Sequence, residues 1–262
     1  MPVQAISTTP KRLRILGEEE IEALYGRPRF TPEERQEYFT FSPPEKAALE
    51  QFHSLSSRLY CMLQLGYFKA RQLFFVFSLR EVEEDVRYLQ EQYFPTARFR
   101  AVEITKVTRF KQQRVILALC HYRHCDAVAR HQLAVKAQQA AQVCAKPVYV
   151  FRELWHFLTT QRLVAPGYTV LQELIGKALT AEQQRLVMVI RAHLEPTDIA
   201  AFQRLLEDAP GLYAITQLKH DPKDFSASEI KREIQRGTQL QPLYALAQRV
   251  LPALQISNES IK

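Results

Sequence analysis

The sequence predicts an all-α fold made of two consecutive helical bundles. Six capping boxes, in which Ser or Thr precedes Glu or Gln by three positions, come directly before apolar residues at helical spacing. Only seven glycines occur among 262 residues, which disfavours a strand-rich fold with many tight turns. The capping boxes are Thr31/Glu34, Ser42/Glu45, Ser78/Glu81, Thr169/Gln172, Thr180/Gln183 and Ser226/Glu229.

The first bundle is expected to contain helices over 18–25, 32–39, 43–53, 55–75, 79–93 and 107–121. Proline stands at the first helical position of two of them, where its missing N–H costs nothing. The helix at 43–53 would bury Ala47, Leu49 and Phe52. The segment 97–104 alternates in polarity, which favours a short extended stretch. The aromatic stretch at 67–77 fits core packing better than base stacking.

The second bundle is expected to contain helices over 127–144, 147–161, 169–179, 181–193, 197–207, 227–236 and 240–253. The helix at 147–161 carries Val148, Phe151, Trp155 and Leu158 on one face. Together these ranges predict a helical domain at 1–126, a second at 127–255, and a frayed tail or linker at 256–262. No apolar run approaches the 18 residues of a membrane span, and the N-terminus lacks the apolar core of a signal peptide.

Positive charge is concentrated in one segment. Residues 101–150 hold eight Lys and Arg against two Asp and Glu, whereas the chain as a whole carries a net charge of +7. Such a block is typical of a surface that meets a phosphate backbone, although an acidic protein partner would also suit it. The candidate phosphate contacts are Lys106, Arg109, Lys111, Arg114, Arg123 and Arg130.

The segment 147–179 resembles a helix-turn-helix unit, with a turn longer than usual at 162–168. On its second helix Leu171, Leu174 and Ile175 would face inward, leaving Thr169, Gln172 and Lys177 to project together. Glutamine can read base edges and lysine can reach a phosphate. We therefore expect Thr169, Gln172 and Lys177 to contact DNA.

No metal or catalytic site is expected. On a continuous helix Cys120/His124 and His121/Cys125 are i, i+4 pairs that point about 100° apart, so they cannot converge on one ion. Sequence motifs of nucleotide-binding loops, serine hydrolases and zinc proteases do not occur. The chain is expected to have no cofactor and to do no chemistry itself.

Five segments together resemble the N-terminal region of the Tn3-type replicative transposases, including its domain of unknown function 4158. They are EYFTFS from Glu37, RLYCMLQLG from Arg58, RFKQQRVILALCHYR from Arg109, RLVAPGYTVL from Arg162 and LKHDPKDFSASEIKREI from Leu218. The sequence departs from the family pattern at His121-Tyr122, which stand where a glycine-containing turn is expected.

The resemblance implies sequence-specific binding of double-stranded DNA at the terminal inverted repeats of a transposon, in the bacterial cytoplasm and nucleoid. It adds Arg162 to Arg109, Arg114 and Arg123 as conspicuous basic positions. The catalytic carboxylates, and any self-association, are expected in a part of such a transposase that would follow residue 262. The alternative functions are a helical protein-interaction module with an acidic partner, and a helical nuclease without a visible site.

Overall fold

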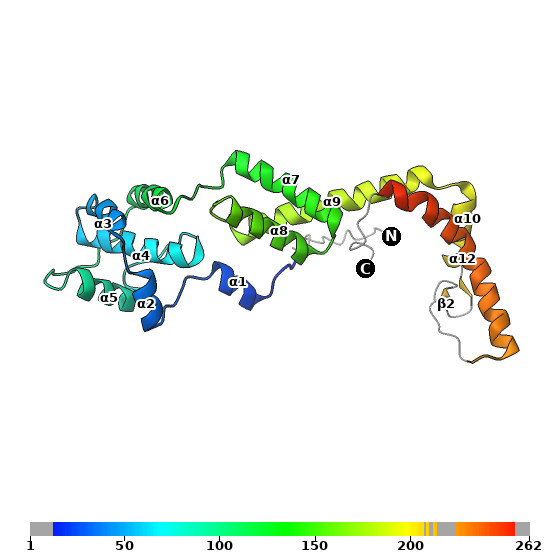
Figure 1. The fold of residues 1–262 in the computed structure, drawn as a ribbon, viewed down its shortest axis with the longest axis horizontal. Coiled ribbons are helices and arrows are strands. Elements are labelled where there is room, and N and C mark those ends of the chain that lie inside the picture. The colour runs from blue at the N-terminus through cyan, green and yellow to red at the C-terminus, as the bar shows by residue number, and fades with distance from the viewer. Residues whose placement is uncertain (1–12, 207, 210–211, 214–223, 255–262) are drawn as a thin grey trace, which may run out of the picture. The chain divides into compact units, whose positions relative to one another are not determined.

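The computed structural model describes residues 13–206, 208–209, 212–213 and 224–254, and these residues form an all-α fold, as predicted. The helices, drawn in Figure 1, are α1 (Glu18–Tyr25), α2 (Pro32–Tyr38), α3 (Pro43–Glu50), α4 (Leu55–Arg71), α5 (Glu83–Tyr93), α6 (Lys106–Cys120), α7 (Ala127–Val143), α8 (Pro147–Thr160), α9 (Tyr168–His193), α10 (Pro196–Leu206) and α12 (Ala227–Leu254). The strands β1 (Asp208–Ala209) and β2 (Leu212–Tyr213) form a short antiparallel pair that the sequence did not predict. The expected tail at 256–262 lies outside the described residues.

The capping boxes locate three helix starts correctly. Thr31 and Ser42 cap α2 and α3, and in each the glutamate three residues on accepts from the cap amide. The Ser226 hydroxyl accepts from the Glu229 amide at 3.3 Å at the start of α12. The boxes predicted at Thr169 and Thr180 are wrong, because α9 begins at Tyr168 and runs unbroken through both.

The helices α3, α4 and α5 are each shorter than predicted by three or four residues, and two predicted pairs of helices are fused. α4 ends at Arg71 because Gln72 adopts the left-handed conformation, with φ at 55°. Ser78 and Glu81 do form their hydrogen bonds, but they close a turn that precedes α5. The helices expected at 169–179 and 181–193 are both part of α9, and those expected at 227–236 and 240–253 are both part of α12.

The first core is built around α4, which is buried from Ser56 to Phe68 except at Arg58. A helix that is apolar on all sides needs neighbours all round, and α2, α3, α5 and α6 supply them. Phe77 is buried and the rest of the aromatic stretch beyond α4 is mostly half-buried, in agreement with core packing. Ala47, expected in this core, is exposed instead, whereas Leu49 and Phe52 are buried.

The helix α1, the helix α8 and the first turns of α9 pack together through aromatic rings. Tyr25 meets the rings of Trp155 and Tyr168 at 5.7 and 5.9 Å between centroids. The Tyr168 hydroxyl accepts from the backbone amides of Ile15 and Leu16 at 3.3 and 3.0 Å. These contacts join segments that lie about 150 positions apart in the sequence.

The chain divides into two units whose boundary differs from the one at 126/127 that the sequence suggests. Unit 1 comprises Met1–Ala137 and Lys146–Lys177, and unit 2 comprises Gln138–Ala145 and Ala178–Lys262. The segment resembling a helix-turn-helix therefore belongs almost entirely to unit 1, because its aromatic residues pack on α1. In unit 2, Leu246, Val250 and Leu254 of α12 form a small core with apolar residues of α9.

Candidate nucleic-acid interface

The helix α6 separates its side chains into a buried face and an exposed basic face. Gln112, Ile116 and Leu117 are buried against the first core, where the Gln112 amide donates to the Ser57 carbonyl at 2.8 Å. The other face exposes Lys106, Val107, Phe110, Lys111 and Arg114, which recur every three to four residues and so lie on one side of the helix. The helix contains four Lys and Arg and no Asp or Glu, so no acidic group of its own neutralises this face.

The cations of α6 differ from those that stabilise the fold. Arg35, Lys69 and Lys136 each form an ion pair with a carboxylate at 2.9 Å or less. By contrast, no ion pair within the described part of the chain involves Lys106, Arg109, Lys111, Arg114, Arg123, Arg130, Arg162 or Lys177. Their charge is available to an external anion.

A groove of about 730 Å³ runs along α6, and we call it the α6 groove. One wall consists of residues 51–54 and Ser57, where α3 ends and α4 begins, and the other of Thr108, Lys111, Arg114, Val115 and Ala118. Its lining contains two cations and His53 but no carboxylate. The N-terminus of α4 also lies at this corner, and its amides add to the positive potential.

Sequence reasoning found Lys111 and Arg114 but missed His53, Ser54 and Thr108. These residues come from segments that are separated by more than 50 positions, and no local pattern links them. Only the packing of α3 and α4 on α6 brings them together.

The two remaining α6 cations, Lys106 and Arg109, do not line the α6 groove. The Lys106 ammonium lies 5.7 Å from the centre of the Phe110 ring, so it sits on the exposed face. Arg109 is half-buried and lines a separate pocket between α6 and the loops at 76–81 and 101–104. The four α6 cations are therefore divided between the α6 groove, the exposed face and a second pocket.

Backbone pairing brings together Arg123 and Arg162, which the sequence placed in different domains. The Arg123 amide donates to the Arg162 carbonyl and the Val164 amide donates to the Arg123 carbonyl, each at 2.9 Å. Both arginine side chains are exposed. The helix α8 ends at Thr160, and two residues later Arg162 adopts the left-handed conformation, with φ of 49°. Arg130 is exposed in the first turns of α7.

The face of α9 that was predicted to read bases is partly covered by the chain itself. Thr169 and Lys177 are exposed, as expected for contacts with DNA. Gln172 is half-buried, and its side-chain amide donates to the Leu13 carbonyl at 2.9 Å. Because that N–H already has a partner, Gln172 is a poorer base reader than its helical position suggested.

The cysteines and histidines after α6 do not form a metal cluster. His121 ends the helix in the left-handed conformation, with φ of 57°, in the place where glycine is usual. Burial raises the pKa of the Cys120 thiol to about 11. No three His, Cys, Asp or Glu side chains among the described residues are placed to share a metal ion.

Among the residues that the structure describes, no helix is long and apolar enough to cross a membrane.

Comparison with models of protein families gives a match. The model of the family named Domain of unknown function (DUF4158) matches residues 15–178. This range ends one residue after the last segment of unit 1, in the middle of α9. No curated protein matches the sequence. Because the match covers more than half of the 262 residues, the chain belongs to the DUF4158 family.

Proposed function

We propose that unit 1 binds double-stranded DNA through α6 and that the protein acts in DNA transposition, by recognising the terminal inverted repeats of a transposon. The observation that carries the DNA-binding proposal is the basic face of α6, whose cations Lys106, Lys111 and Arg114 have no ion-pair partner among the described residues. The transposition proposal rests on the resemblance of five sequence segments to Tn3-type transposases. The chain itself is proposed to be non-catalytic.

The α6 face suits a duplex in shape as well as in charge. A single α-helix fits the major groove, and its side chains reach phosphates on both sides. Lys111 and Arg114 in the α6 groove would contact one phosphate strand, and Lys106 the other. Val107 and Phe110 lie between them, 66% and 53% exposed, where apolar side chains can touch thymine methyl groups.

A salt titration tests this proposal. We expect binding to an inverted-repeat duplex to weaken linearly on a log–log plot as salt rises. Replacing Lys111 and Arg114 by alanine should lower the slope by about one unit for each phosphate that is no longer neutralised, on cognate and random DNA alike. The matched control is Arg87→Ala/Arg152→Ala, which removes the same charge from exposed positions on α5 and α8. Equal slopes for the two double variants would refute the proposed role of the α6 groove.

A second titration locates the base-reading helix. If α6 reads bases, Phe110→Ala should reduce the preference for cognate over random DNA, whereas Gln172→Ala should leave it unchanged. The opposite result would return base reading to α9. Circular dichroism must show both variants folded, because Gln172 also contributes a hydrogen bond to Leu13.

The second candidate function is a module that docks an acidic protein. The exposed Val107 and Phe110 favour it, because apolar side chains inside a charged face are also common at protein interfaces. A protein partner would give a much shallower salt dependence than DNA. If the wild-type chain fails to bind any duplex at low salt, docking of an acidic protein is the candidate function that remains.

A further inference from the structure

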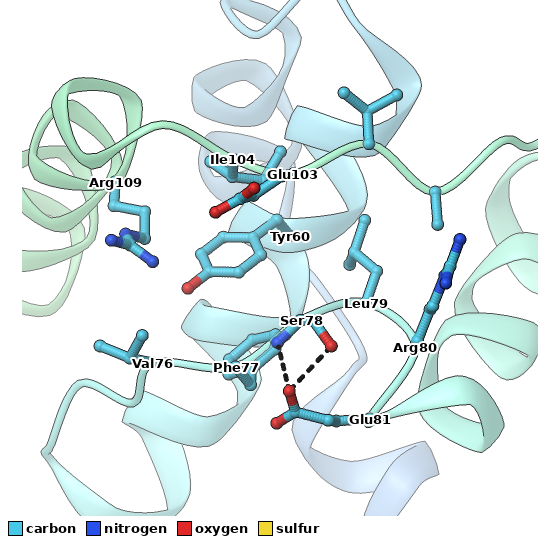
Figure 2. A pocket seen from close by; sticks show the side chains of 12 residues that line it. Tyr60, Val76, Phe77, Ser78, Leu79, Arg80, Glu81, Glu103, Ile104 and Arg109 are labelled. Carbon is cyan, nitrogen blue, oxygen red and sulfur yellow. Dashed lines mark hydrogen bonds between the residues drawn. The ribbon is translucent and has the colours of Figure 1, made fainter.

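A second hollow lies beside α6, on a different side of the helix from the α6 groove. It has a volume of about 400 Å³ and is enclosed by α4, α6 and the loops at 76–81 and 101–104. Figure 2 shows these loops passing on either side of Tyr60. We call this hollow the Tyr60 pocket. A nucleobase is smaller than this volume, so the pocket is large enough for one.

Part of the lining of the Tyr60 pocket is apolar. The rings of Tyr60 and Phe77 stack with centroids 4.6 Å apart, and both are almost fully buried beneath the pocket. Two further lining residues, Val76 and Val102, are 77% and 56% exposed, so the two loops offer apolar surface beside the hollow.

Polar groups gather at one end of the pocket. In Figure 2 the Arg109 guanidinium, the Glu103 carboxylate and the Tyr60 hydroxyl lie toward the same side. Arg109 and Glu103 are in no ion pair within the described residues, although both line the pocket. The Tyr60 hydroxyl accepts from the Gln64 amide at 3.2 Å and retains its own proton to donate. A ligand edge with acceptors next to donors would satisfy all three groups.

We propose that the Tyr60 pocket receives one unstacked base of the DNA bound to α6, with guanine as the preferred base. Guanine presents O6 and N7 as acceptors for an arginine, and N1–H and N2–H₂ as donors for a carboxylate. Arg109 would meet the edge that carries O6 and N7, Glu103 would meet the adjoining edge that carries N1–H and N2–H₂, and Val76 and Val102 of the lining would supply apolar surface to the ring. This inference rests on the proposed function of unit 1.

The surroundings of the pocket also suit a nucleic acid. Arg80 lines its far end, and Arg98 and Arg100 are exposed on the segment that leads into it. None of the three is in an ion pair with a described carboxylate. Phosphates that flank an unstacked base would therefore find cations on both sides of the pocket. An uncharged planar ligand would have no need of these arginines.

The test compares three duplexes by fluorescence anisotropy with the full chain. They share one sequence and differ in the centre, which is fully paired, carries one unpaired guanosine, or carries the same bulged sugar without a base. The unpaired base avoids the energy of opening a pair, so the wild type should bind the guanosine bulge at least tenfold more tightly than either other duplex. A bulged adenosine should bind less tightly than the guanosine.

Two variants show whether the pocket is responsible. Ala101→Phe places a ring in the pocket and should abolish the bulge preference while affinity for the paired duplex is retained. The matched control, Ala192→Phe, makes the same change at an exposed position of unit 2. Glu103→Gln keeps the size of the side chain and should remove the preference for guanosine over adenosine. The Glu103→Gln variant therefore tests the role of the Tyr60 pocket even if Ala101→Phe fails to fold.

The outcomes separate the two proposals. If the wild type binds none of the duplexes, the DNA-binding function of unit 1 is refuted. If it binds the paired, guanosine-bulged and base-free duplexes equally, the duplex function stands and the pocket inference is overturned. Equal binding of the guanosine bulge and the base-free bulge, both tighter than the paired duplex, would also overturn it, because the protein would then recognise bending rather than a base.

Discussion

Gly66 in the middle of α4 lies directly beneath the ring of Phe39, and this contact predicts an unusual response to alanine. A Cβ atom at position 66 would lie 2.3 Å from Cε1 and 2.4 Å from Cδ1 of Phe39. Real carbon atoms do not approach so closely, so one of the two must move. By contrast, a Cβ atom added at Gly176, inside α9, would have nothing within 4 Å. The two glycines therefore form a matched pair.

The magnitudes follow from two opposing effects. Gly→Ala in a helix interior stabilises by about 1 kcal/mol. Overpacking a filled core costs about 1–3 kcal/mol. Phe39 is 1% exposed and touches the rings of Phe30, Tyr67 and Tyr88, so it cannot easily move aside. We expect Gly66→Ala to destabilise unit 1 by about 1–2 kcal/mol and Gly176→Ala to stabilise it by about 0.5–1 kcal/mol.

Urea denaturation followed by the fluorescence of Trp155 measures both effects, because this is the only tryptophan in the chain and it lies in unit 1. A double-mutant cycle with Phe39→Leu provides the control. When the ring is shortened, Gly66→Ala should lose most of its cost. If Gly66→Ala raises the urea midpoint in the wild-type background, the close approach to Phe39 does not limit this core and the reasoning is refuted.

Three further predictions concern tertiary contacts, pH and metals. Tyr168→Phe removes the acceptor for two backbone amides and should destabilise unit 1 by about 1–3 kcal/mol. The control is Tyr88→Phe, which should change the urea midpoint little because the Tyr88 hydroxyl makes no hydrogen bond within the described residues. Equal midpoints for the two variants would contradict this prediction. Burial acts to raise the pKa of the Glu45 carboxyl, but hydrogen bonds from Lys69 and from its own cap residue together lower it. A carboxyl with a lowered pKa stabilises the folded state above the unfolded pKa of about 4.3, and this contribution is lost as the pH falls below that value. The stability advantage of the wild type over Glu45→Gln should therefore shrink as the pH falls through about 4. An advantage that stays constant between neutral and strongly acidic pH would argue against this prediction. A chelator should leave the helical circular-dichroism signal unchanged, and a collapse with release of zinc would show that the Cys120–Cys125 segment holds a structural metal after all.

The sequence determined the secondary structure because helix signals are local. Capping boxes formed as predicted at Thr31 and Ser42. At Ser226 only half of the box formed, because the hydroxyl accepts from the Glu229 amide whereas the Ser226 amide donates to Asp224. All three set helix starts through contacts within four residues. The box at Thr169 failed because Tyr168 and Gln172 are held by residues 13–16 instead. A pairing across 150 positions leaves no local pattern. The continuity of α9 and α12 was missed for a related reason, since a polar residue or glycine inside a long helix resembles a boundary.

The concentration of charge in residues 101–150 was likewise readable from the sequence, since charge depends on composition alone. Only the tertiary structure decided where that charge lies. It placed Lys111 and Arg114 in a groove with His53, turned Arg109 into a different pocket, and joined the backbones of Arg123 and Arg162. It also moved the unit boundary, because rings on α1 pack against α8 and α9. The physical reason is that burial and packing depend on which distant residues meet, whereas helix formation and net charge are set by neighbours in the chain.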